Sequence, residues 1–84
     1  MFGHGGDYLL RGEAYFQLGN YQQAIKDYDK AIELNPKFVL AYISRSLAYY
    51  KLGNYQQTIA DLKIAARLGD TGSQDSLREM GIDW

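Results

Sequence analysis

The side chains that could carry acid–base or metal chemistry are few and poorly placed for it. The chain has one histidine, His4, within the glycine-rich residues 1–6, and it has no cysteine. A nucleophile with its base, or a zinc site, needs several such groups close together. The carboxylates of Asp27, Asp29 and Glu33 fall on the polar side of an amphipathic segment, where solvation is the usual state. The sequence therefore predicts a protein that is not an enzyme, with no metal and no cofactor.

Two pairs of opposite charges share one spacing. Arg11 precedes Asp27 by sixteen residues, and Arg45 precedes Asp61 by the same interval. The recurrence predicts an ion pair that joins the two helices of a hairpin or joins adjacent hairpins. Partial exposure would keep the contribution of such a pair near ~0–1 kcal/mol. Contact with a ligand and simple solvation are the alternatives.

This spacing is part of a longer internal repeat. The hexapeptide LGNYQQ at Leu18–Gln23 recurs unchanged at Leu52–Gln57, a shift of 34 residues. Matches in the same register lie on both sides of it: Tyr8, Arg11, Ala14, Tyr15, Ile25, Asp27, Ala31 and Leu34 recur as Tyr42, Arg45, Ala48, Tyr49, Ile59, Asp61, Ala65 and Leu68. A self-match at such a period indicates a helical repeat array.

Apolar periodicity predicts four helices and a short fifth. They span residues 8–18, about 21–34, 37–52, 55–68 and a polar segment from Thr71 to before Gly81. The glycines at positions 19, 53 and 69 are expected to end helices. The expected N-caps are Asp7, Asn20, Asn35, Asn54 and Thr71, with Gln23, Gln57 and Gln74 at capping-box spacing and Pro36 in the first turn of the third helix.

With these residues in register, the chain resembles the tetratricopeptide repeat family, whose signature is W-x2-L-G-x2-Y, A-x3-F and P over 34 residues. Gly12, Tyr15, Ala24, Tyr28 and Pro36 fit the first copy, with Tyr8 for the Trp and Arg11 for the Leu. The second copy has drifted: Thr58, Leu62 and Asp70 replace the Ala, the aromatic residue and the Pro.

The resemblance implies an all-α fold. We expect two antiparallel helix-turn-helix repeats, residues 7–36 and 37–70, in a right-handed superhelical stack, preceded by a flexible leader at 1–6 and followed by a capping helix and tail at 71–84. Small residues must receive bulky side chains where helices cross. Gly12 and Ala24 are the expected receivers in the first hairpin, and Ser46 and Thr58 in the second.

The third predicted helix has two apolar stripes, one facing its own hairpin and one with Leu40, Ile43, Leu47 and Tyr50. One hairpin cannot bury both. In the resembled family the first helix of each repeat lines a concave groove that receives peptides, which implies a protein-protein interaction module, or scaffold, that binds a peptide or helix of a partner. The expected partner-binding residues are Leu9, Glu13, Phe16, Gln17, Leu40, Ile43, Leu47, Tyr50 and Lys51.

Other interpretations of the second stripe stay open. Neighbouring helices could cover part of it, or the chain could be a self-assembling unit, a homo-oligomer whose groove or repeat edges are covered by another copy. It could also be a regulatory fragment of a larger protein. Some family members clamp a C-terminal carboxylate with Lys, Asn and Arg, but Leu9, Glu13, Ile43 and Leu47 occupy those places here, which argues against that ligand.

Charge and hydropathy narrow the class of partner. The formal net charge is −1, so no long-range field would gather phosphates and nucleic acid is not an expected partner. No run approaches the ~20 apolar residues of a membrane-spanning helix, so membrane insertion is not expected either. Without a visible signal peptide, the expected location is cytoplasmic.

Overall fold

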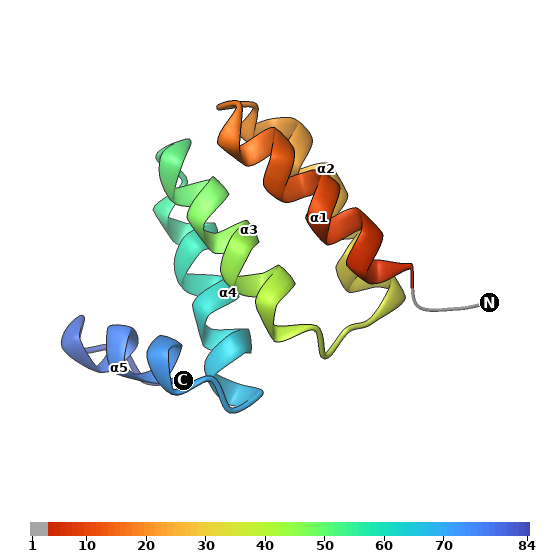
Figure 1. The fold of residues 1–84 in the computed structure, drawn as a ribbon. Helices are drawn as coiled ribbons and strands as arrows, with labels where there is room; N and C mark the ends of the chain where they lie inside the picture. The colour runs from red at the N-terminus through yellow and green to blue at the C-terminus, as the bar shows by residue number, and fades with distance from the viewer. Residues whose placement is uncertain (1–3) are drawn as a thin grey trace.

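The computed structural model describes residues 4–84, which form helices and connecting turns with no strand among them. The helices are α1 (Gly5–Gln17), α2 (Tyr21–Leu34), α3 (Val39–Lys51), α4 (Tyr55–Arg67) and α5 (Thr71–Glu79). The first four form two antiparallel hairpins, α1 with α2 and α3 with α4 (Figure 1). The predicted all-α fold class is confirmed.

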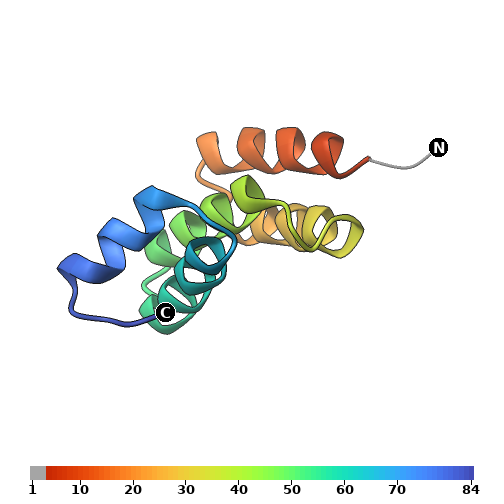
Figure 2. The same cartoon turned by 90° about the horizontal axis from the view of Figure 1, so that it is seen from below.

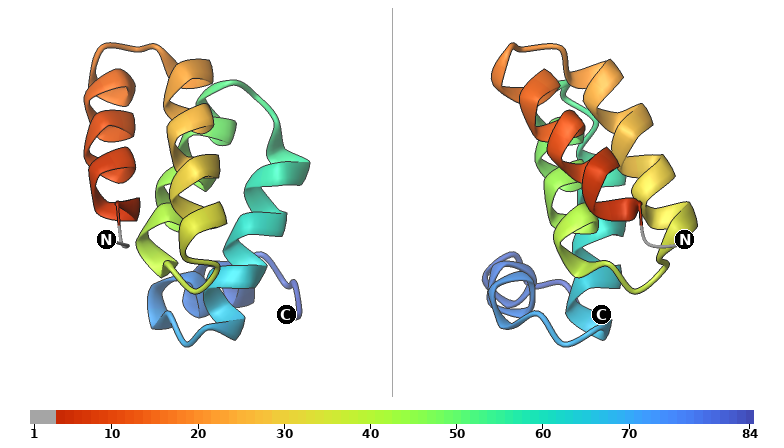
Figure 3. Two further views of the ribbon diagram at one scale, coloured as in Figure 1. Left: turned by 90° about the vertical axis from the view of Figure 1, so that its right-hand side faces the viewer. Right: turned by 45° about the vertical axis from the view of Figure 1, so that its right-hand side comes forward.

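The two hairpins stack through α2 and α3. Seen from below, α1 lies at one edge of the stack, and α2 and α3 lie side by side between α1 and α4 (Figure 2). The fifth helix packs mainly on α4, and it lies across the end of the second hairpin rather than along its length (Figure 3).

A glycine with positive φ ends each of the first, third and fourth helices, as predicted. Gly19, Gly53 and Gly69 have φ values of 79°, 78° and 105°, a conformation that costs glycine little because it has no Cβ. In the first of these turns, the backbone N–H of Asn20 donates to the carbonyl of Tyr15 at 2.9 Å. This is the Schellman arrangement, which satisfies a carbonyl left free at the helix end.

The same turns explain why the capping boxes are only half formed. The side chain of Asn20 accepts from the backbone N–H of Gln23 at 3.4 Å, and the cap at Asn54 repeats this at 3.3 Å. The backbone N–H groups of both asparagines already donate to carbonyls of the preceding helix. The glutamine side chains therefore have no free cap amide to accept from.

The predicted start of the first helix was wrong. The helix begins at Gly5 with His4 at its N-cap position, so Asp7 lies inside the first turn, where its carboxylate is 3.3 Å from His4 Nδ1. Of the leader expected at residues 1–6, residues 1–3 lie outside the described part of the chain, and Gly5 and Gly6 are helical. Packing of Gly5 against Ala31 and Phe38 of the neighbouring segments offsets the low helix propensity of glycine.

Two further helix starts differ from prediction. The third helix begins at Val39 rather than at Lys37, because the Asn35 side chain accepts from the backbone N–H of Lys37 and closes a turn ahead of the helix. The fifth helix is capped by Asp70 rather than by Thr71. The Asp70 carboxylate accepts from both the backbone N–H and the hydroxyl of Ser73, at 2.8 and 2.7 Å.

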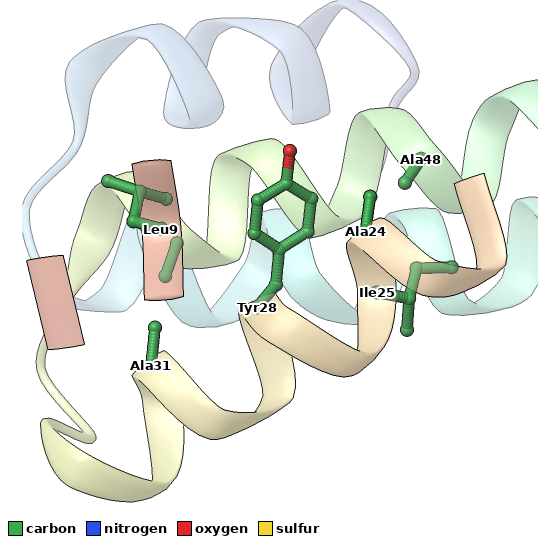
Figure 4. Close-up of a cluster of buried hydrophobic side chains, with 7 residues drawn as sticks. Leu9, Ala24, Ile25, Tyr28, Ala31 and Ala48 are labelled. Atoms are coloured by element: carbon green, nitrogen blue, oxygen red, sulfur yellow. The ribbon is translucent and has the colours of Figure 1, made fainter. Parts of the chain in front are cut away.

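Tyr28 of α2 stands at the centre of the core (Figure 4). It is fully buried with Leu9, Ala24 and Ala31 beside it. Its ring lies against the backbone of Gly12, where a Cβ atom would come within 2.6 Å of the ring. The prediction that Gly12 receives a bulky side chain is confirmed.

Both predicted ion pairs are present. Arg11 donates twice to Asp27, at 2.9 and 2.8 Å, and Arg45 donates twice to Asp61, at 2.9 and 2.7 Å. Arg45 also reaches Asp29 of α2 at 2.7 Å, so it joins the two hairpins. The hydrogen bond with the buried Asp61 carboxylate raises the pKa of Arg45 above its ordinary value, so the guanidinium group stays charged across the accessible pH range.

Candidate functional site

Helix α3 presents three faces, and only one of the two predicted apolar stripes is buried. Tyr42 and Ser46 are buried within their own hairpin. A narrow third face, formed by the small residues Ala41, Ser44 and Ala48, is buried against the first hairpin. Sequence reasoning missed this face because alanine and serine contribute little to an apolar pattern.

The second predicted stripe remains at the surface. Leu40, Leu47 and Tyr50 are 51%, 50% and 55% exposed, and Ile43 is half-buried. Neighbouring helices of the same chain therefore leave about half of Leu40, Leu47 and Tyr50 uncovered. The exposed apolar residues of α3 thus belong to the second stripe that was predicted from the sequence.

The predicted partner-binding residues of α1 have different surroundings. Leu9 is only 6% exposed and belongs to the core, so the expectation that it lines a groove was wrong. It shares the buried face of α1 with Gly5 and Gly12, which lie four residues before and three after it. Glu13 and Gln17 are exposed, and Phe16 is half-buried.

An apolar pocket of about 420 Å³ opens between α3, α4 and α5. We call it the α3–α4–α5 pocket. It is lined by Ser46, Leu47, Tyr50, Tyr55, Thr58, Ile59, Leu62, Ser76 and Met80. Four of these, Leu47, Tyr50, Tyr55 and Met80, are large hydrophobic side chains about half exposed to solvent.

Two hydroxyl groups in the wall of this pocket already have hydrogen-bond partners. The Ser46 hydroxyl donates to the carbonyl of Ile43 at 2.6 Å, and the Thr58 hydroxyl bonds the carbonyls of Ser46 and Asn54 at 3.2 and 3.0 Å. Within residues 4–84, no Asp, Glu, Lys, Arg or His lines it. The pocket can therefore hold an apolar side chain, but it offers no charge to fix a polar ligand.

Two of the predicted binding residues, Leu47 and Tyr50, line this pocket, and its seven other lining residues were not predicted as a site. The sequence held one usable signal: Gly81 stands where Leu47 stands in the preceding copy, so the fifth helix had to be too short to cover them.

A smaller cavity of about 150 Å³, the α1–α3 cleft, lies between the first helices of the two hairpins. It is lined by Glu13, Phe16, Gln17, Ser44 and Leu47. The Tyr28 hydroxyl donates to the Glu13 carboxylate; burial, together with this hydrogen bond, raises the pKa of Tyr28 above its ordinary value. Leu47 lines both cavities, so the two form one continuous surface across α3. Leu40, Ile43 and Lys51 line neither.

A third depression, of about 340 Å³, is lined by His4, Asp7, Tyr8 and Arg11. Its charged groups already have partners: Asp7 with His4, and Arg11 with Asp27. Among residues 4–84, no three His, Cys, Asp or Glu side chains gather in a way that could hold a metal ion. None of the helices formed by these residues has the length and apolar character needed to cross a membrane.

Comparison with known proteins adds one finding. No curated protein sequence matches the chain. A family model described as TPR repeat matches residues 12–53, which is half of the chain. That range runs from the middle of α1 through α2 and α3 to the glycine that ends α3, so it includes the Gly12–Tyr28 contact and the junction of the two hairpins. The sequence match and the paired antiparallel helices agree, and the chain belongs to the TPR repeat family.

Proposed function

We propose that the chain is a non-catalytic module that binds a peptide or a helix of another protein through the apolar surface formed by the α3–α4–α5 pocket and the α1–α3 cleft. TPR repeats are a protein-interaction fold. The proposal narrows that general role to one surface of this chain.

The observation that carries the proposal is the gathering of exposed apolar side chains around one cavity. Leu47, Tyr50, Tyr55 and Met80 come from three different helical segments, yet all four line the same pocket. A small domain gains little net stability from its single core. Leaving several large apolar side chains exposed in one patch is typical of an interaction site.

Binding through this surface would bury side chains that are otherwise in contact with water. Each large apolar side chain removed from water contributes about 1.5–3 kcal/mol when it becomes fully buried. Partial burial of a few such groups, less the cost of ordering a partner, gives affinities in the micromolar range. The module would therefore bind partners reversibly.

The helix α3 provides a matched pair of variants for the test. Leu40 and Leu47 are equally exposed, at 51% and 50%, but only Leu47 lines the cavities. Peptides selected from a random displayed library against the unmodified domain serve as probes. Their affinity should fall at least tenfold for Leu47→Asp and should stay within threefold for Leu40→Asp.

Circular dichroism of both variants must first show an unchanged helix content. The proposal is wrong if no peptide is selected. It is equally wrong if the selected peptides bind Leu47→Asp as tightly as they bind the unmodified domain.

A further inference from the structure

We infer that the occupant of the α3–α4–α5 pocket is a helical segment of about two turns from a partner protein, with a small residue such as alanine at its central contact position. This inference rests on the proposed function and deepens it by stating the conformation and chemistry of the partner. The internal repeat supports this inference, because the equivalent surface of the first hairpin is covered by α3.

Equivalent residues of the two hairpins lie 34 positions apart, and they differ sharply in burial. Tyr21 is half-buried, whereas its counterpart Tyr55 is 59% exposed. Ile25 is 9% exposed, whereas Ile59 is half-buried. The surface that is part of the core in the first hairpin is open in the second.

The difference arises from the length of the helix that packs on each hairpin. Helix α3 runs beside α2, whereas α5 lies across the end of the second hairpin and packs on that end of α4. The helix α3 then continues to Lys51, but α5 ends at Glu79, the counterpart of Arg45. The open surface is therefore the part that the last two turns of α3 cover in the first hairpin.

The covering segment of α3 shows what fits there. Ala48 is fully buried in one cluster with Ala24, Ile25 and Tyr28. A small side chain at this position lets the backbone of the covering helix approach closely. The open pocket retains Ile59 and has Thr58 and Leu62 in place of Ala24 and Tyr28. An apolar helix with a small central residue would fit this surface by the same packing.

A second copy of the chain is a less suitable occupant. The outer face of α1 carries exposed Leu10 and Ala14, the counterparts of Ser44 and Ala48. A second copy docked as α3 docks would bring its residues 5–11 to the end of α4 on which α5 already packs. The α3–α4–α5 pocket, at about 420 Å³, admits only a short segment.

The probe for the test is a stapled ten-residue peptide with the sequence of residues 44–53 of this chain, titrated into the ¹⁵N- and methyl-labelled domain. We expect shifts of the Tyr55, Ile59 and Met80 signals. Placing glutamate at the peptide's Ala48 position should weaken binding at least tenfold. Placing it at the Ser46 position, on the opposite face of the peptide helix, should change binding less than threefold. Tyr55→Asp in the domain should remove binding.

The possible results separate the two proposals. If the stapled peptide causes no shifts but displayed peptides still depend on Leu47, the pocket binds partners in another conformation and this inference is wrong, while the proposed function stands. If neither kind of peptide depends on the pocket, both are wrong. A concentration-dependent dimer in sedimentation that Tyr55→Asp dissociates would make the occupant a second copy and would also overturn the inference.

Discussion

Replacing Gly12 by alanine should destabilise the domain, although alanine is the better helix former. A Cβ atom at position 12 would lie 2.6 Å from Cε1 and 2.9 Å from Cδ1 of the Tyr28 ring, and 3.2 Å from the carbonyl oxygen of Ala24. The ring cannot move aside easily, because Tyr28 is fully buried and its hydroxyl is held by Glu13. The two helices of the first hairpin would have to separate.

The magnitude follows from two opposing terms. Overpacking a well-packed core costs about 1–3 kcal/mol, and the two ring contacts place Gly12→Ala near the upper end. Alanine has a higher helix propensity than glycine, which offsets up to about 1 kcal/mol of this cost. The expected net loss is about 2 kcal/mol of unfolding free energy, which for a domain of this size lowers the midpoint of thermal unfolding by roughly 8–16 °C.

Urea denaturation followed by circular dichroism measures this loss. A Cβ atom added at Gly6 in the same helix would have nothing within 4 Å, so Gly6→Ala is the matched control and should be neutral or stabilising by about 0.5 kcal/mol. In the second hairpin, Ser46 and Leu62 replace Gly12 and Tyr28. The cost of Gly12→Ala should therefore fall by about 1 kcal/mol in a Tyr28→Leu background. A Gly12→Ala variant at least as stable as the unmodified chain would refute this account of the packing.

Other predictions concern the ion pair, the buried tyrosine and a helix end. Asp61→Asn should cost about 3 kcal/mol in urea denaturation, since it leaves Arg45 without its buried carboxylate partner; a loss under 1 kcal/mol would contradict the role given to the pair. Because the pKa of Tyr28 is raised in the folded state, the unfolded chain releases that proton first as pH rises above about 10. The unfolding free energy should thus be level just below about pH 9 and fall above pH 10. In Tyr28→Phe this fall should be less steep, and equal slopes in the two proteins would argue against a raised pKa of Tyr28. Gly53→Ala should cost about 1 kcal/mol because φ is 78° there; thermal unfolding at an unchanged temperature would show the turn to be more tolerant.

Much of the fold could be predicted because local and repeated signals agree. The positive-φ glycines, the asparagine caps and the Arg–Asp pairs each recur in both copies. Helix starts were harder, because a competing contact decided each one. Gly5 is helical because it packs against Ala31 and Phe38. Asn35 closes a turn before the third helix can begin.

The candidate site was only half predictable for a related reason. The exposure of Leu47 and Tyr50 follows from the width of the apolar surface on α3, which one hairpin cannot bury. Exposure of Tyr55 and Ile59 depends on how far a different helix extends, and no pattern within α4 records that length. Burial of Leu9 likewise depends on its neighbours in space, Tyr28 and Ala31.

The most direct test of the central claim is a set of intermolecular nuclear Overhauser effects between the stapled segment of residues 44–53 and the labelled domain. We predict contacts from the peptide's Ala48 methyl group to the Ile59 and Tyr55 side chains. Contacts confined to the Glu13 and Phe16 side chains would contradict this claim, as would the absence of any contact at peptide concentrations that saturate the domain.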